Sequence, residues 1–226
     1  RYTEVAENLQ DRFTVIRYDR RCCGRSTGDR SQMLDMAQQA RDAAAVIKAV
    51  AAGRANVFGN SGGGNIALKL AEDAPGLIDK LVVHEPPVLK LLDDSVEWIG
   101  FTDKIEATFR DKGLMPAMMM FLSQVKGIKG PPPGRAPNPR NLEFFMEKEI
   151  HNICRYTPDL ARIMENGVAM ATAAGRDSLD ANYARTARVI SDRTGCPCVD
   201  FAGHHFSAGS DPAQYATDII AALQVA

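Results

Sequence analysis

Short apolar runs alternate along this chain with stretches in which apolar residues recur every three or four positions. Such alternation is typical of an α/β fold, a mostly parallel sheet with helices on both faces. Each run is short and almost continuously apolar, as expected for a strand that is buried on both faces. The expected strands are residues 13–18, 56–58, 81–84, 168–173 and 198–201, and the expected packing helices are residues 33–52, 65–74 and 211–225.

One long stretch, residues 88–160, interrupts this alternation. It holds three amphipathic segments, residues 95–112, 114–125 and 141–156, and a run rich in glycine and proline at 130–139. We therefore expect an α/β core made of residues 1–87 and 161–226, with residues 88–160 inserted as a helical lid. Most apolar side chains of the insertion should only pack it on the core. Trp98, Met119 and Phe145 are the candidates for facing a substrate pocket, since methionine-rich surfaces adapt to varied ligands.

Composition excludes several classes of function. The 226 residues are 45% hydrophobic and carry 27 basic and 28 acidic side chains scattered along the chain, so no basic stripe suits nucleic acid. No apolar run approaches the roughly 20 residues that cross a bilayer, and the polar first residues do not resemble a signal peptide, so we expect no membrane span and a cytoplasmic protein. The five cysteines have no zinc-site spacing, which predicts free thiols and no metal.

The sharpest motif is a serine flanked by glycines, in the sequence Gly59-Asn60-Ser61-Gly62-Gly63. It fits G-x-S-x-G and lies between an expected strand and an expected helix, the context in which a nucleophilic serine stands on a tight turn with no space for side chains at the flanking glycines. Ser61 is then the nucleophile, Gly62 N–H faces the oxyanion and Asn60 lies near the substrate. The alternative is a glycine-rich turn or phosphate cradle, but the P-loop lysine and G-x-G-x-x-G are missing.

A serine nucleophile needs a histidine base, and the chain has four histidines. His204 and His205 follow the last expected strand, where a loop should lie over the strand ends, so either could be the base. His151 falls in the insertion and is expected at the surface.

The histidine in turn needs a carboxylate to orient it. Asp177 follows the expected strand at 168–173 and gives the chain order serine, aspartate, histidine, so it is the first candidate. Asp180 lies close behind, and Glu85 is the candidate if the acid sits one strand earlier. Asp177 could also do no more than cap a helix that begins near residue 178.

Three segments resemble the α/β-hydrolase superfamily, in particular its bacterial serine esterase-like members: residues 18–26 (YDRRCCGRS), 59–63 (GNSGG) and 84–87 (HEPP). The resemblance covers nearly the whole chain outside the insertion. It implies that the base is His205, which completes a Phe-x-Gly-x-His pattern that begins at Phe201. It also implies that the inserted helices form a lid over an acyl or alcohol pocket, and that the chemistry needs no cofactor.

The chain departs from this family in two places. Family members usually have a glycine where this chain has Cys22 or Cys23, so we expect a local, structural rearrangement of that turn. Relatives also begin with further strands and a glycine-containing loop that supplies a second oxyanion donor. That loop is not found here, which implies either that residues precede Arg1 or that the oxyanion hole is incomplete.

Together these residues predict a serine hydrolase that cleaves small carboxylic esters through Ser61, His205 and Asp177. Lactone hydrolysis, cleavage of a carbon–carbon bond beside a ketone, and peracid formation use the same triad and stay open. A serine at the turn argues against the epoxide hydrolases and haloalkane dehalogenases of related folds, whose nucleophile is a carboxylate. The alternative from another class is a ligand-binding protein that keeps the fold without catalysis.

Overall fold

The computed structural model describes residues 2–51, 53–128 and 138–226, and within them a parallel sheet of four strands. The strands are β1 (Ala55–Asn60), β2 (Ile78–His84), β3 (Met170–Gly175) and β4 (Cys198–Phe201), and they lie side by side in chain order. The pairs Asn60–His84 and Gly175–Phe201 bring the carboxyl ends of the strands to one edge. These strands confirm four of the five expected ones.

The fifth expected strand, at residues 13–18, is wrong. Within the described ranges this segment forms no ladder, and β1, at the edge of the sheet, pairs with β2 alone. The alternation seen in the sequence has another cause. Phe13 and Val15 pack on an apolar cluster beside the sheet, whereas Ile16 and Tyr18 are exposed. An amphipathic pattern reports this one-sided burial, but a strand also needs a neighbouring backbone to pair with.

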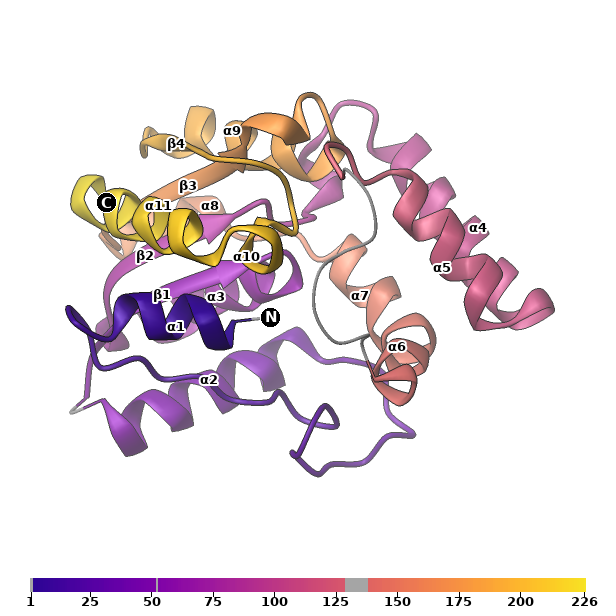
Figure 1. Cartoon of the computed structure of the whole chain (residues 1–226), viewed down its shortest axis with the longest axis horizontal. Coiled ribbons are helices and arrows are strands. Elements are labelled where there is room, and N and C mark those ends of the chain that lie inside the picture. The colour runs from indigo at the N-terminus through magenta and orange to yellow at the C-terminus, as the bar shows by residue number, and fades with distance from the viewer. Residues whose placement is uncertain (1, 52, 129–137) are drawn as a thin grey trace.

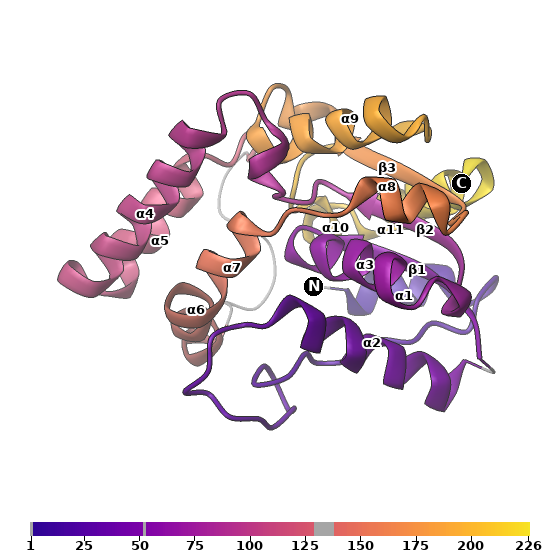
Figure 2. The same cartoon turned by 180° about the vertical axis from the view of Figure 1, so that it is seen from behind.

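Helices cover both faces of the sheet (Figures 1 and 2). On one face α1 (Thr3–Leu9) packs against α11 (Pro212–Val225), and Val5, Leu9 and Tyr215 are buried there with strand residues such as Val82 and Phe201. The other face holds the larger cluster, to which four helices contribute. They are α2 (Met36–Val50), α3 (Gly62–Asp73), α8 (Leu160–Glu165) and α9 (Asn182–Thr194). The expected helices at 33–52, 65–74 and 211–225 are confirmed.

The stretch that breaks the alternation is helical, as expected, and stands at one end of the sheet (Figure 1). It contains α4 (Ser95–Lys112), α5 (Leu114–Ser123), α6 (Pro139–Phe144), the π-helical turn η3 (Phe145–Glu149) and α7 (Ile150–Arg155). Its glycine- and proline-rich run lies largely outside the described residues.

Short elements complete the described chain: η1 (Pro75–Leu77), η2 (Leu89–Leu91), η4 (Arg176–Ser178) and α10 (Ser207–Ser210). None of the helices in the described ranges combines the length and the apolar character needed to cross a membrane.

Candidate active site

Ser61 occupies a strained turn between β1 and α3. Its φ of 55° and ψ of −130° lie in a region that residues with a side chain rarely adopt, at a cost of about 1–3 kcal/mol. Backbone hydrogen bonds hold this conformation, because Ser61 N donates to His84 O at 2.9 Å and Gly64 N donates to Ser61 O at 2.8 Å. The position of the Ser61 hydroxyl is therefore set by the conformation of the backbone at this turn.

The glycines around Ser61 have unequal roles. A Cβ on Gly59 would lie 2.5 Å from the carbonyl oxygen of Gly63, so that position accepts no side chain. A Cβ on Gly64 would lie 3.0 Å from Val83, whereas one on Gly63 would meet nothing within 4 Å. The expectation that a side chain has no space at the flanking glycines is therefore correct for Gly59 and wrong for Gly63. Gly63 contributes to the turn through its backbone, which packs against Gly59.

Gly62 is the first residue of α3 and lines the same pocket as Ser61. The N–H groups of a first helical turn have no acceptor within the helix, and the helix dipole adds positive potential there. Gly62 is therefore placed to donate to an oxyanion that develops beside Ser61.

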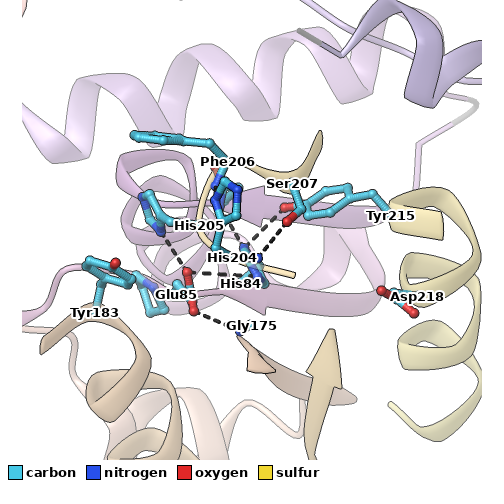
Figure 3. Close-up of polar contacts among 12 residues, drawn as sticks. His84, Glu85, Gly175, Tyr183, His204, His205, Phe206, Ser207, Tyr215 and Asp218 are labelled. Carbon is cyan, nitrogen blue, oxygen red and sulfur yellow. Dashed lines mark hydrogen bonds and ion pairs between the residues drawn. The ribbon is translucent and has the colours of Figure 1, made fainter. Parts of the chain in front are cut away.

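His205 reaches this pocket from the loop after β4, and its partner is Glu85 (Figure 3). His205 Nδ1 lies 2.7 Å from Glu85 Oε2, and both side chains are buried. Glu85 Oε1 accepts the N–H of Gly175 at 2.8 Å. Burial alone would raise the pKa of Glu85, but the hydrogen bond from His205 and the nearby imidazoles outweigh it and lower the pKa, so the carboxylate is held as an anion.

Asp177, the first candidate for the acid, does not contact His205. It lies exposed in the turn η4, where its backbone N–H donates to Gly203 O at 2.7 Å, and Asp180 is exposed as well. Glu85 takes the expected place because it follows the interior strand β2 directly and its side chain is buried beneath the His205 loop. The signal in the sequence is a carboxylate placed directly after His84, the last residue of a strand whose preceding residues 81–83 are buried and apolar.

His204 and His205 diverge although they are neighbours. His204 Nδ1 accepts the N–H of Phe206 at 3.1 Å, and the backbone N–H of His204 donates to Ser207 Oγ. Of these two histidines, only His205 bonds to Glu85 in the described part of the chain. Ser61 and His205 line one pocket without a direct hydrogen bond in the described chain, the looser arrangement common in sites without substrate.

A second histidine, His84, lies behind Glu85. Asn60 Nδ2 donates to His84 Nδ1 at 2.7 Å, and Tyr215 Oη lies 3.1 Å from the same nitrogen. His84 Nε2 is left 4.0 Å from Glu85 Oε2. Burial lowers the pKa of His84 to about 4, so it is neutral at pH 7. Asn60 therefore supports His84 from within the fold and does not line the substrate pocket, contrary to expectation.

The pocket beside Ser61 is small, with a volume of about 50 Å³. Since one water needs roughly 10–15 Å³ on this measure, it holds a group of only a few heavy atoms. The inserted helices supply much of its wall, including Phe121, Phe145 and Ile150. Of the three candidates in the insertion, Phe145 is in the wall. Met119 is 70% exposed, and the indole of Trp98 packs on Phe101 and donates to Asp94.

The described residues offer one possible cation group outside this pocket, made by Asp103, Glu106 and His151. Arg155 forms ion pairs with both carboxylates, so a guanidinium already supplies the positive charge there. His151 is half-exposed and paired with Glu106 at 3.1 Å. All five cysteines are free thiols, as expected.

Comparison with known families and curated proteins gives a consistent picture. The model of the alpha/beta hydrolase fold family matches residues 1–113. A putative carbamate hydrolase, RutD of Caulobacter vibrioides (strain NA1000 / CB15N), is 39% identical over 164 residues, which cover 69% of this chain and 55% of the relative. The chain thus spans about half the length of that protein. An uncharacterized hydrolase, YraK of Bacillus subtilis (strain 168), is 25% identical over 91% of this chain and 77% of the relative.

Solved structures show the same fold at low identity. MGS-M2, an alpha/beta hydrolase enzyme from a Medee basin deep-sea metagenome library, superposes with a TM-score of 0.74 at 12% identity, covering 97% of this chain and 82% of that one. The enol-lactonase from Burkholderia xenovorans LB400 gives a TM-score of 0.68 at 16% identity over 99% of this chain and 85% of that one.

Proposed function

Because the chain belongs to the α/β-hydrolase family, we propose that it hydrolyses small carboxylic esters or related acyl compounds, with Ser61 as the nucleophile. The observation that carries this proposal is the arrangement of three side chains around one pocket. Ser61 stands on a strained turn in a pocket shared with His205, and the far nitrogen of that imidazole is bonded to the buried anion Glu85. Nothing in simple packing requires these three features together.

The roles follow from the geometry. Glu85 accepts Nδ1–H of His205, which leaves Nε2 with the lone pair that can take the Ser61 proton. Ser61 Oγ then attacks the acyl carbon, and Gly62 N–H stabilises the oxyanion. His205 returns the proton to the leaving group, and water releases the acyl group by the same steps. Glu85 replaces Asp177 as the orienting acid in this scheme.

The size of the pocket limits the acyl group. A lid rich in methionine and phenylalanine suggests room for long acyl chains, but about 50 Å³ suits an acetyl or another group of similar size. In the proposed enzyme, the helices α4 to α7 serve as the lid that sets this limit.

Carbamate hydrolysis is a second candidate, favoured by the 39% identity to a protein named a putative carbamate hydrolase. The same three residues would serve, since a carbamate differs from an ester only in bearing nitrogen on the acyl carbon. Lactone hydrolysis, carbon–carbon cleavage and peracid formation have no such specific support.

The test is acylation of Ser61. Wild-type protein should react with a fluorophosphonate probe and hydrolyse p-nitrophenyl acetate, and Ser61→Ala should lose both while keeping its circular dichroism spectrum. Labelling of the variant at the wild-type rate would exclude Ser61. A wild-type protein that binds small esters but is never labelled would be the non-catalytic binding protein.

Paired carboxylate variants test the choice of acid. Glu85→Gln should lower kcat by roughly 10³–10⁴-fold, because the amide no longer selects the Nδ1–H tautomer of His205. Asp177→Asn, the matched control, should stay within about threefold of wild type, since Asp177 is exposed and does not contact His205. The reverse ranking would restore Asp177 as the acid.

A further inference from the structure

The pocket beside Ser61 has mostly hydrocarbon walls, but two amide side chains interrupt them. Gln124 follows α5 and Asn182 begins α9, and both line the pocket. Asn182 Nδ2 donates to Gln124 Oε1 at 3.0 Å. The pair thus joins the inserted helices to the core across the pocket.

Most other polar groups in this wall are already engaged. The hydroxyl of Thr102 donates to Trp98 O at 3.1 Å, and the hydroxyl of Tyr183 accepts the N–H of Lys126 at 2.9 Å. Burial raises the pKa of the Cys154 thiol to about 11, so it remains protonated. Ser61 and His205 belong to the reacting centre.

The amide pair has two further polar groups that its internal hydrogen bond does not use. Its internal bond uses the oxygen of Gln124 and one N–H of Asn182, which leaves Gln124 Nε2 as a donor and Asn182 Oδ1 as an acceptor. Neither has a hydrogen-bond partner in the described chain, and neither is among the fully buried polar atoms that lack one. Asn182 is only 3% exposed, so the access of its oxygen is to the pocket and not to the outer surface.

A donor beside an acceptor is complementary to a group that presents a carbonyl oxygen next to an N–H. A carboxylate would offer two acceptors and a negative charge, and no lysine or arginine lines the described pocket to balance it. A simple alkyl group would leave both amides unpaired, which costs binding free energy. The best match is a neutral amide-type group.

Size and position put that group next to the reacting carbon. Asn182 directly precedes Tyr183, whose ring lies 4.4 Å from the ring of His205 (Figure 3). With a volume of about 50 Å³, the pocket has no room for a spacer of several atoms. We propose that Gln124 and Asn182 form a subsite for a neutral amide N–H group attached to, or one atom from, the acyl carbon, as in a carbamoyl compound. This inference rests on the proposed function and narrows its substrate class.

The reaction this implies is balanced without a cofactor. Ser61 Oγ attacks the carbamoyl carbon and the phenolate of phenyl carbamate leaves, taking the proton from His205. Water then cleaves the carbamoyl–serine bond and releases carbamic acid, which decomposes to carbon dioxide and ammonia.

Phenyl carbamate and phenyl acetate form the test pair, because their acyl groups have equal numbers of heavy atoms and differ in NH₂ against CH₃. The measurement is the ratio of kcat/KM for carbamate to that for acetate, by phenol release. Gln124→Met changes a half-buried position and is expected to lower this ratio about tenfold. Asn182→Leu should lower the ratio similarly. Thr102→Val, whose hydroxyl is already engaged, is the matched control and should keep the wild-type ratio.

A ratio unchanged within twofold in both amide variants, while Ser61 is still labelled by the fluorophosphonate, would overturn the subsite and leave the proposed function intact. If wild-type Ser61 is never labelled, the proposed function fails, and ligand-detected NMR on Ser61→Ala tests the subsite alone. Acetamide should then bind at least fivefold more tightly than acetone, and Gln124→Met should abolish the difference. Equal binding of the two ligands would refute the subsite.

Discussion

Glu85 is placed between two histidines with different tasks. His205 bonds to Oε2 at 2.7 Å and opens to the pocket, whereas His84 approaches the same oxygen to 4.0 Å from inside the core. Because Asn60 donates to Nδ1 of His84, the proton of the neutral ring sits on Nε2 and faces the carboxylate. His84 therefore stabilises the anion with a dipole and adds no charge to the site.

Burial of His84 makes stability depend on pH. The pKa of His84 is about 4 in the fold and 6.5 in the unfolded chain, so below pH 6.5 the unfolded state binds the proton more readily and stability falls as the pH drops toward 4. The lowered pKa of Glu85 acts in the same direction below about pH 4.5. Urea unfolding at pH 7.0 and 4.5 should show a loss about 2 kcal/mol smaller in His84→Phe than in wild type. An equal loss in the two proteins would contradict the assignment.

At this scale, the sequence supports Ser61 more firmly than its partners. The proposed nucleophile is recognised from local context, since the strand, the glycines and the helix that strain Ser61 are all within a few residues of it. The acid is not local. Asp177 and Glu85 both follow strands and both lie between Ser61 and His205 in the chain, so chain order does not separate them. Which carboxylate turns inward depends on how the loop after β4 packs, and no spacing in the sequence encodes that.

Among the elements, the π-helical turn η3 connects the early part of the chain to the pocket. Phe145 at its start lines the pocket, and Glu149 at its end is 1% exposed at the side chain and accepts both terminal nitrogens of Arg20, at 2.6 and 2.9 Å. Leu34 N also donates to Lys148 O at 2.8 Å. An irregular helical turn is thus held in place by a bidentate ion pair.

Removing only the arginine of the Arg20–Glu149 ion pair should lower the free energy of unfolding more than replacing both residues by apolar ones. Arg20→Met leaves the carboxylate of Glu149 buried without a counter-charge, and we expect it to lower the free energy of unfolding by about 2–4 kcal/mol at pH 7. Arg20→Met combined with Glu149→Leu should recover at least half of that loss, because the buried charge is gone. Guanidinium titrations of the wild type, the single variant and the double variant give the three free energies of unfolding that this comparison needs. A double variant no more stable than Arg20→Met would show that the ion pair does not determine the stability of this region.

Element types were easier to predict than pairing. The helix expected at 95–112 coincides with α4, because its apolar spacing and the glycine after it are local signals. Residues 13–18 carry an equally good local pattern and form no strand. The turn that contains Cys22 also departs from what local propensity predicts. Cys22, one of the two positions where the resemblance implies a glycine, adopts a φ of 66°, a left-handed conformation that favours glycine over residues with a side chain.

At the scale of the molecule, the inserted helices are continuous with the core. The first residues of the insertion, Leu89 and Leu92, are buried in its apolar cluster with Ile105 and Ile150, and Val189 of α9 in the core packs against the same cluster. Arg185 of α9 adds a two-point ion pair to Asp94 at the start of α4. The connection after β2 is therefore a packed junction and not an exposed linker.

This continuity predicts that the insertion and the core unfold together. Trp98 is the only tryptophan and lies in the cluster of the insertion, so its fluorescence reports on the insertion alone, while far-ultraviolet circular dichroism reports on every helix and strand. The two urea transitions of the wild-type protein should coincide, the usual sign of a single cooperative unit. Ile105→Ala, at a position 1% exposed, should shift both midpoints together by the equivalent of about 2–5 kcal/mol at an unchanged slope. If the fluorescence transition alone moves to lower urea, the insertion is an independently unfolding unit, and the junction at Leu89 and Leu92 does not couple it to the sheet.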